Sequence, residues 1–530
     1  MNITSLDICP VLVNLIIQPE LLLMKKIRNL NRREFLGTAA SIAAFTVVPR
    51  HVIGGRGYVA PNDKITLGYI GCGTQGLREM VRLVSNPDVQ IVAACDPEND
   101  NTNYIDWSPT GIRNSIREVL EEPSWGEGVK GIRAGRAVAK EVVEKYYAKK
   151  RSAEKFNGCS SYTDFKELLD KEKDLDAVKI MTPDHLHATI SIAAMKKGKH
   201  VIMHKPLANR VYEARLVAQT ARTTGVVTHL LAWRRSNDEL RKMILSGAIG
   251  TLKEIHNWTD RPYWPQYSRI PTEQVPVPPS FDWDMWLGPV PDRPYHPHYT
   301  HAVFRGWYDF GAGSIADMGN YSLWPVFDSL GLGIPESVEA LPCGYSEIAD
   351  QISKIYPNDF SFPNACIVKF KLPASGELPP LDLYWYDGGM RPMTPDELRP
   401  DKKAMPATGL MFVGDKGKIL GDQIIPEKKM FEYLGVSQLP EREQQRRGNA
   451  DAVWVEAIKT GKQSPGSFNN VANVTETICL AGAALRFSRK NFKAETTTPP
   501  LEWDAQAMKF TNMPDADKYL VREYRSGWEL

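Results

Sequence analysis

Apolar residues in the first half of the chain form short runs that alternate with helical patterns. Each run spans four to seven residues, which suits a buried strand better than a helix. The strand-like runs are 64–70, 89–95, 177–181, 200–203 and 226–231. The helical patterns are 77–84, 162–169, 186–197 and 211–223. This alternation predicts an α/β fold with a doubly wound parallel sheet over residues 62–233.

A different pattern begins after Trp233. Tryptophan, proline and tyrosine crowd residues 258–324, and then strand-like runs and helical patterns return. The strand-like runs are 337–341, 365–372 and 381–386, and the helical patterns are 450–460 and 471–486. Residues 234–530 are therefore expected to form an α+β domain with a large, mostly antiparallel open sheet and an extended tail. Residues 99–135, rich in Gly, Pro, Trp and Asn, are interpreted as a surface insertion into the first domain.

The N-terminal segment is set apart by its charge. Basic residues at 25–33 include the pair Arg32-Arg33, and a weakly apolar run of small residues follows as far as Phe45. This order is typical of an export signal, and the pair resembles the twin-arginine signal, whose pathway exports folded proteins. We therefore expect a periplasmic protein, and interpret residues 1–55 as the signal together with a mis-assigned extension before Met24. The alternatives are an ordinary amphipathic helix and a retained membrane anchor.

Composition narrows the classes of partner. The chain has 530 residues, with 65 Lys plus Arg and 63 Asp plus Glu, so its formal net charge is +2. A balanced charge favours neither nucleic acid nor an anionic membrane, and it suits an uncharged, polyhydroxylated ligand. The 7 Cys contain no CxxC pair, so neither a zinc ribbon nor a disulfide framework is indicated. We expect a small-molecule ligand, no nucleic acid and no stable membrane partner.

A glycine-rich turn follows the first strand-like run at once. It opens the next helical pattern, and an aspartate ends the second run 20 residues after the last glycine. Glycines at this spacing permit a tight turn and the approach of a pyrophosphate, which the helix N-terminus attracts. The aspartate accepts hydrogen bonds from ribose hydroxyls and repels a 2′-phosphate, so the pattern predicts NAD, with NADP less favoured. The alternative is a turn that binds nothing. The cofactor-binding residues predicted here are Gly71, Gly73, Thr74, Gln75, Gly76 and Asp96.

Three further motifs join the glycine turn. They are Thr182-Pro183-Asp184-His185-Leu186-His187, His204-Lys205-Pro206-Leu207, and Gly311-Ala312-Gly313-Ser314-Ile315-Ala316-Asp317-Met318-Gly319. As a set, the motifs resemble the Gfo/Idh/MocA family of sugar and polyol oxidoreductases over residues 62–530. The C-terminal stretches 501–504 and 527–530 resemble its exported Bacteroidetes- and planctomycete-type branch. The resemblance implies an NAD-dependent oxidoreductase with a Rossmann domain, and it adds to the cofactor site Thr182, Pro183, His187, Lys205 and Pro206.

The resemblance also implies a catalytic set, with two departures. In the family, a lysine after the fifth strand contacts the substrate hydroxyl, and an Asp is followed four residues later by a His. Lys205 and Asp317 match, whereas His204 replaces the family's Glu and Tyr321 replaces its His. Trp324 stands where many members have Asp. We predict a cis bond before Pro206, and as catalytic residues Lys205, Asp317, Tyr321 and His204.

Each of the four predicted catalytic residues has an expected role in the reaction. Lys205 serves as the base if burial and an oxidised nicotinamide favour its neutral form, and Asp317 orients it. Tyr321 relays the proton or holds the substrate oxygen, unless it merely packs on a helix face, and His204 either bonds the cofactor ribose or replaces the missing imidazole. The substrate-side candidates are Trp233, Arg234, Tyr295, His296 and Tyr299. No metal is predicted, with the spacing of His296, His298 and His301 as a minor alternative.

Export and cofactor constrain the function together. Because NAD is scarce outside the cytoplasm, a protein exported in its folded state is expected to carry the cofactor tightly bound. We predict an oxidoreductase acting on a secondary hydroxyl of a sugar or glycoside, as a dimer or tetramer. One alternative is an NAD-dependent redox-neutral glycosidase or lyase, and the other is a non-catalytic protein that binds NAD or sugar.

Overall fold

The computed structural model describes residues 64–530 apart from 153–155, 438–448 and 492–497. The predicted export signal at residues 1–55 lies outside the described residues. Among the helices of the described part, none is both long and apolar enough to cross a membrane.

The first domain is built on a six-stranded sheet in the order β3-β2-β1-β4-β5-β6, with every pair parallel. This is the strand order of a doubly wound dinucleotide-binding fold, so the predicted α/β class is confirmed. The strand order reverses between the neighbouring strands β1 and β4, whose carboxyl ends flank a crevice in folds of this kind. The strands are β1 (Ile65–Ile70), β2 (Val89–Cys95), β3 (Ser160–Tyr162), β4 (Ala177–Ile180), β5 (His200–Met203) and β6 (Thr228–Leu230).

Helices cover the sheet where the periodic patterns predict them, and two further helices were not predicted, one of them in the insertion described below. Helix α5 (Arg136–Lys150) went unpredicted because lysines interrupt its apolar positions, although Val138, Val142 and Tyr147 are buried. The others are α3 (Thr74–Leu83), α6 (Phe165–Lys171), the 3₁₀ turn η2 (Asp184–Leu186), α7 (His187–Lys196) and α8 (Val211–Thr224).

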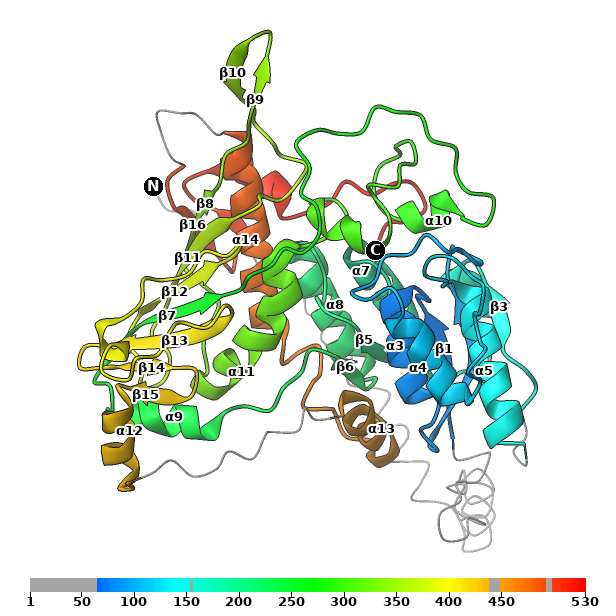
Figure 1. Cartoon of the computed structure of the whole chain (residues 1–530), viewed down its shortest axis with the longest axis horizontal. Coiled ribbons are helices and arrows are strands. Elements are labelled where there is room, and N and C mark those ends of the chain that lie inside the picture. Colours follow the sequence, from blue (N-terminus) through cyan, green and yellow to red (C-terminus); the bar gives the residue numbers. More distant parts are fainter. Residues whose placement is uncertain (1–63, 153–155, 438–448, 492–497) are drawn as a thin grey trace, which may run out of the picture. The chain divides into compact units, whose positions relative to one another are not determined.

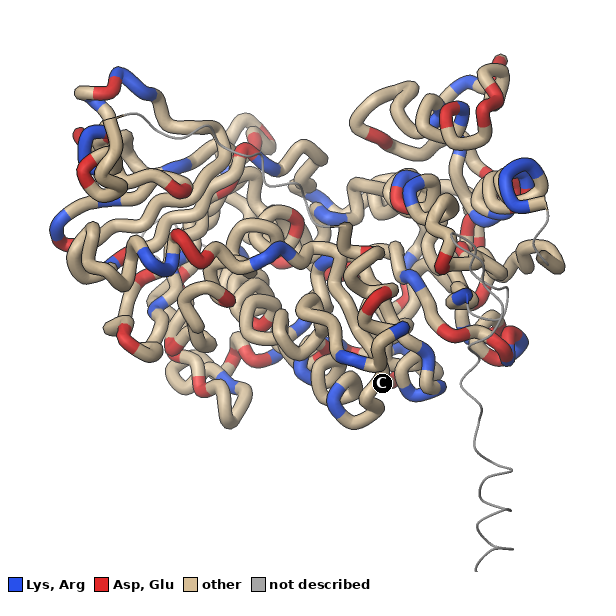
Figure 2. Tube along the Cα trace, turned by 90° about the horizontal axis from the view of Figure 1, so that it is seen from below, with Lys and Arg blue, Asp and Glu red and all other residues tan. Residues whose placement is uncertain are grey.

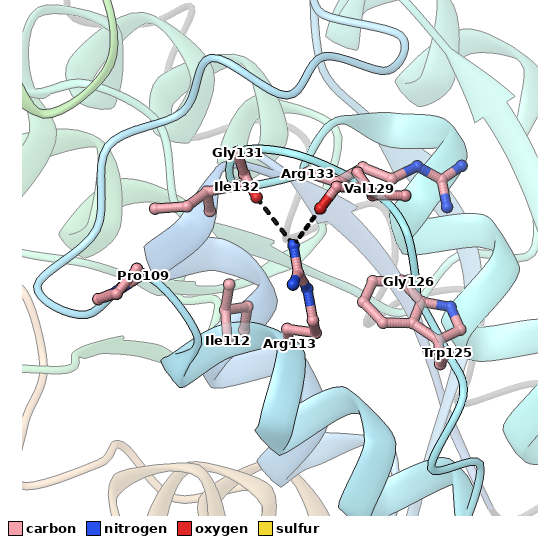
Figure 3. A pocket seen from close by; sticks show the side chains of 9 residues that line it. All are labelled: Pro109, Ile112, Arg113, Trp125, Gly126, Val129, Gly131, Ile132 and Arg133. Carbon is pink, nitrogen blue, oxygen red and sulfur yellow. Dashed lines mark hydrogen bonds between the residues drawn. The ribbon is translucent and has the colours of Figure 1, made fainter.

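The predicted insertion contributes to the core and does more than cover the surface. It contains α4 (Gly111–Leu120), whose Ile112, Ile116 and Leu120 face inward beside α3 and α5. Arg113 closes the loop that follows, since its guanidinium donates to Val129 O at 2.7 Å and Gly131 O at 3.0 Å (Figure 3). The cavity beside it holds only about 10 Å³, enough for about one water and too little for a substrate.

The second domain contains a nine-stranded sheet in the order β15-β14-β13-β7-β12-β11-β8-β16-β17. Its pairs are antiparallel except β7 with β12, as expected for a mostly antiparallel sheet. The strands are β7 (Leu252–Trp258), β8 (Ser337–Pro342), β11 (Cys366–Leu372), β12 (Leu381–Tyr386), β13 (Gly409–Gly414), β14 (Lys418–Leu420), β15 (Gln423–Ile425), β16 (Leu501–Asp504) and β17 (Lys509–Phe510). A separate hairpin, β9 (Ser346–Ala349) and β10 (Ile352–Ile355), projects from it (Figure 1).

Helix α14 (Ala472–Lys490) packs against both β8 and α8, so one apolar core runs from the parallel sheet to the large sheet. The tail returns to the first domain, where Arg522 donates to Glu213 of α8 at 2.7 Å and Lys166 lies over the Trp528 ring. The remaining helices are α9 (Asp238–Leu245), α10 (Trp283–Leu287), η3 (His301–Gly306), η4 (Ile315–Gly319), α11 (Asn320–Leu330), η5 (Asp396–Leu398), α12 (Glu427–Leu434), α13 (Ala450–Thr460) and η6 (Pro514–Tyr519). The domain boundary predicted at residue 233 stays a prediction; β6 ends at Leu230 and β7 begins at Leu252.

Candidate active site

A cavity of about 1200 Å³ opens at the carboxyl ends of β1, β2, β4 and β5. Its walls include Gly71, Asp96, Thr182 and Lys205, each just after one of these strands, and Asp317 of the second domain. Ligands of doubly wound sheets bind at this edge, where the strand order reverses. The volume exceeds that of most single-ligand pockets and leaves room for a dinucleotide with a small substrate.

The glycine turn has the backbone that a dinucleotide site requires. Gly71 has φ +97°, and a Cβ on it would meet Met181 C at 2.5 Å. A Cβ on Gly76 would meet Gly71 O at 2.1 Å, so glycine is needed where helix α3 touches the turn. Gly73 gives α3 no side-chain cap, which leaves the N–H groups of the first turn to an anion. The turn therefore fits the pyrophosphate of NAD.

Asp96 is already engaged by the chain. Its carboxylate accepts from Cys72 N at 2.6 Å and from Glu98 N at 2.8 Å, which fixes it at the end of β2. Burial raises the pKa of Asp96 to about 6, although both backbone hydrogen bonds act in the opposite direction. Each carboxylate oxygen keeps a further lone pair for a ribose hydroxyl.

The insertion reaches over the glycine turn. Thr74 donates through its hydroxyl to Ile105 O at 3.0 Å, and Arg78 of α3 pairs with Asp106. The Tyr104 ring lies beside Gly73, where a Cβ would stand 3.2 Å from it. The segment thus covers the place at which the turn would hold a pyrophosphate.

The residues after β4 and β5 separate into cavity wall and support. Thr182 and Pro183 line the cavity, and the buried Thr182 hydroxyl has no partner in the described part of the chain. His187 lies behind them, with its ring nitrogens 2.6 Å from Pro206 O and 2.9 Å from Thr182 O. Because burial lowers the pKa of His187 to about 4, its neutral ring donates to one of these carbonyls and ties the two strand ends together. The Lys205–Pro206 bond is cis.

Lys205 and Asp317 meet at the reacting end of the cavity. Lys205 donates from its Nζ to the Asp317 carboxylate, and both side chains are largely buried. Asp317 lies in a π-helical turn, Ile315–Gly319, that runs into α11; such turns are common at functional sites. This contact fixes Lys205 Nζ beside the Asp317 carboxylate.

Two arginines stand beside the same carboxylate. Arg305 Nε lies 3.6 Å from Asp317 Oδ1, and Arg261 Nε lies 4.0 Å from Oδ2. Burial by itself would raise the pKa of Asp317, but the charges of Lys205 and Arg305 outweigh it and hold the pKa below the usual value. Asp317 is therefore ionised and surrounded by positive charge.

Tyr321 and His204 complete the wall. The Tyr321 ring lies 5.7 Å from Lys205 Nζ and 4.9 Å from the Arg234 guanidinium carbon. His204 is buried beside Lys205, and burial, followed by the charges of Lys205 and Arg305, lowers its pKa well below the usual value. His204 is therefore a neutral imidazole that can take part in a hydrogen bond.

Several predicted residues lie away from the cavity. Tyr295 and Tyr299 pack around Trp283, with ring centroids 5.4 and 6.3 Å from it. The ring of His296 contacts His298 at 4.3 Å. Trp233 packs on the apolar core, and Trp324 is fully buried. Aromatic burial places these side chains away from the cavity, and of the substrate-side candidates the structure brings only Arg234 to it.

The cavity also contains residues that the sequence motifs did not indicate. They are Arg261, three residues beyond the end of β7, Arg305 in the 3₁₀ turn η3, and His301, whose ring lies tilted against Tyr104 with the centroids 4.0 Å apart. Arg305 precedes the Gly311 motif by six residues. This proximity to the motif was the one signal in the sequence that could have indicated Arg305. An irregular segment has no periodicity from which the direction of its side chains could be predicted.

The comparisons assign both domains. Residues 130–231 match the Gfo/Idh/MocA oxidoreductase family's NAD-binding Rossmann fold. Residues 236–339 match the same family's C-terminal alpha/beta domain. The two matched segments, 130–231 and 236–339, are thus domains of the Gfo/Idh/MocA oxidoreductase family. The first domain of the chain is therefore an NAD-binding Rossmann domain.

Curated relatives match parts of the chain. Levoglucosan dehydrogenase of Pseudarthrobacter phenanthrenivorans is 33% identical over 123 residues, 22% of this chain and 31% of that protein. A glycosyl hydrolase family 109 protein of Stenotrophomonas maltophilia is 27% identical over 229 residues, 43% of this chain and 41% of that protein. The chain thus spans between about a third and two fifths of the length of these relatives.

Among solved structures, GenD2 from gentamicin A biosynthesis, in complex with NAD, is similar with a TM-score of 0.46. It is 14% identical, and the match covers 86% of this chain and 100% of that one.

Proposed function

We propose that the protein is an NAD-dependent oxidoreductase acting on a secondary hydroxyl of a sugar or glycoside. The Lys205–Asp317 ion pair carries the proposal, because it faces the same cavity as the glycine turn. The names of relatives that act on sugars, such as levoglucosan dehydrogenase, support the substrate class. A protein that merely binds NAD has no need of a buried lysine and carboxylate at the far end of the cavity.

The chemistry divides between the cofactor and the chain. When bound, NAD supplies hydride transfer to or from the substrate carbon. Lys205, positioned by its hydrogen bond to Asp317, donates a proton from Nζ to a carbonyl oxygen in the reducing direction and accepts the hydroxyl proton in the oxidising direction. Neutral His204 and the Tyr321 hydroxyl are the further groups that can hold the substrate oxygen.

We further propose that the cofactor is tightly bound. The contacts of Thr74 with Ile105 and of Arg78 with Asp106 support this, because they fasten the insertion over the glycine turn. Release of NAD would require this segment to open. Protein purified in its folded state and then denatured should release close to one NAD per chain, measured by absorbance after removal of the polypeptide.

The test of the reaction uses a panel of neutral and acidic glycosides, with purified, cofactor-loaded protein. Absorbance of the reduced nicotinamide and release of free sugar are measured together. Reduction of the cofactor without cleavage of the glycosidic bond is the expected result. Bound NAD with neither reduction nor cleavage across the panel would overturn the proposal in favour of a binding protein.

A redox-neutral glycosidase is the second candidate. The similarity to a glycosyl hydrolase family 109 protein over 43% of the chain favours it. Cleavage of the glycoside without net reduction in the same assay would select it over the dehydrogenase.

Export through the twin-arginine pathway to the periplasm is also proposed, supported by Arg32-Arg33 and the apolar run after it. The double substitution Arg32→Lys with Arg33→Lys should keep the protein in the cytoplasmic fraction. A homo-oligomer, either a dimer or a tetramer, is proposed as well, with light scattering of the folded protein as its test.

A further inference from the structure

The charge of the cavity differs from that of the chain. Along the chain, Lys and Arg are interspersed with Asp and Glu, and they nearly cancel (Figure 2). The wall around Asp317, in contrast, brings together four cations, Lys205, Arg234, Arg261 and Arg305. Asp317 and the buried Asp184 are the carboxylates placed among them, and burial raises the pKa of Asp184 to about 6. This end of the cavity therefore carries excess positive charge.

Other carboxylates of the cavity do not neutralise it. Asp106 pairs with Arg78, and Asp451 accepts from Lys179 at 2.7 Å. Asp96 is bonded to the backbone at the end of β2. Each of these three carboxylates already has a donor of its own near the glycine turn or the sheet.

Arg261 has donors without acceptors. Its Nε and Nη1 are buried and lack a hydrogen-bond partner in the described part of the chain. The guanidinium carbon lies 3.8 Å from the centroid of the Tyr263 ring and 5.2 Å from that of Trp107, so aromatic faces hold the group in place. Buried N–H groups of a charged side chain are costly to leave unpaired, which indicates that a bound acceptor completes them.

Arg305 is held in the same way from the other side of Asp317. Its guanidinium carbon lies 4.6 Å from the centroid of the Phe304 ring, and Nη1 reaches Ala302 O only at 3.5 Å. With Nε 3.6 Å from Asp317, Arg305 adjoins the same carboxylate as Arg261, and both arginines line the cavity. The arginine fork matches the oxygens of a carboxylate or sulfate.

We propose that the substrate is an acidic sugar whose oxyanion, a carboxylate or a sulfate ester, binds between Arg261 and Arg305 next to the hydroxyl held by Lys205. This rests on the proposed function and replaces the uncharged ligand that the overall composition suggests. The pyrophosphate of the cofactor is not the occupant, because its place is the glycine turn, whereas both arginines adjoin the carboxylate that binds Lys205. Arg261 and Arg305 are thus the specificity-determining residues.

Binding of three methyl glycosides to the NAD-loaded protein, measured by calorimetry, tests the proposal. The probes are methyl glucoside, methyl glucuronide and methyl glucoside 6-sulfate. One acidic probe should bind at least tenfold more tightly than the neutral one, and added salt should weaken that binding alone. Which acidic probe binds more tightly identifies the oxyanion as carboxylate or sulfate.

Matched variants separate the arginines from general effects. Arg261→Gln and Arg305→Gln should each remove most of the preference while leaving the NAD content unchanged, and thermal unfolding identifies a variant that is merely unstable. Arg399→Gln, an exposed arginine in a surface pair, is the control and should behave as wild type.

Two results would overturn the inference. One is a neutral probe that binds as tightly as both acidic ones, and the other is an acidic preference that survives both substitutions. If a neutral glycoside is oxidised in the panel assay, the proposed oxidoreductase function still holds after the acidic-sugar inference has failed. Bound NAD with no turnover of any probe would contradict the proposed function itself.

Discussion

Asp309 and Asp317 stand eight residues apart, and each carboxylate is surrounded by positive side chains. Asp309 lies 2.6 Å from Arg293, 3.2 Å from Arg486 and 3.6 Å from Arg210, and burial that would raise its pKa is outweighed by these charges, which lower it. Asp317 is in the same electrostatic state. The two clusters differ in how many hydrogen-bond acceptors the fold provides for their cations.

The cations around Asp309 find further acceptors in the fold. Arg210 donates to Tyr308 O at 3.0 Å and to Asn209 O at 2.7 Å, and of this group Arg486 Nε lacks a partner. Arg261, beside Asp317, has two nitrogens without a hydrogen-bond partner among the described residues, and it lines a cavity. A cluster whose cations are mostly paired within the fold stabilises it, whereas a cluster with unpaired donors at a cavity is available to a ligand. Substitutions in the Asp317 cluster should therefore lower activity, whereas substitutions in the Asp309 cluster should lower stability.

The largest effect is expected at Lys205. Lys205→Met should lower hydride transfer about 10³-fold, because the proton donor to the substrate oxygen is lost. Single-turnover reduction of bound NAD, with the glycoside that the panel identifies, measures it. Lys197→Met, at an exposed ion pair, is the control. Unchanged turnover by Lys205→Met with NAD still bound would show that the catalytic assignment is wrong.

Asp309→Asn should lower the free energy of unfolding by about 3 kcal/mol, because three arginines lose their counter-charge. Urea unfolding at pH 7 measures it, with exposed Asp396→Asn as control. The low pKa of Asp309 means that its contribution is present above the usual Asp range and fades as the pH falls below about 4. A stability loss that does not change with pH would point to packing and not charge.

Asp317→Asn should lower turnover about 10²-fold, since Lys205 loses its positioning partner while the lysine remains. The free energy of unfolding should fall less for Asp317→Asn than for Asp309→Asn. The cations that lose their counter-charge at Asp317 face a cavity, where water can solvate them. Comparing urea unfolding of the two variants tests this. Greater destabilisation by Asp317→Asn would remove the distinction between the clusters.

The smallest effect is a pH dependence at the other end of the cavity. With the pKa of Asp96 raised to about 6, the carboxylate becomes protonated below that pH and loses a ribose-accepting charge. NAD affinity should therefore fall by up to about tenfold per pH unit below 6, measured by calorimetry on cofactor-stripped protein. Asp96→Asn should bind more weakly with no such dependence between pH 5 and 8.

The first domain was predictable because its signals are local. Strand β5, His200–Met203, matches the predicted run, and the glycine turn lies between β1 and α3 as expected. Helices α4 and α5 were not predicted. The apolar positions of α4 are regularly spaced, but the composition of residues 99–135 led to their interpretation as surface, whereas lysines interrupt the apolar pattern of α5. Both helices are stabilised by packing on one another and on α3.

The site was predictable where a motif carries it. Lys205, Asp317 and Tyr321 come together from two domains, and the motifs name all three. Tyr295 and Tyr299 were selected by residue type, which does not distinguish a sugar-binding surface from an aromatic core.

The sequence by itself determined the Rossmann domain and its NAD cofactor, because strand periodicity, glycine spacing and short motifs are properties of neighbouring residues. The tertiary structure decided the charge of the substrate end. The charged residues there are Lys205, Arg261, Arg305 and Asp317, which come from segments up to 112 residues apart. The near-neutral net charge of the chain gives no sign of the excess positive charge that folding brings together at this end of the cavity. Charge over a cavity depends on distances in space, which composition averages away.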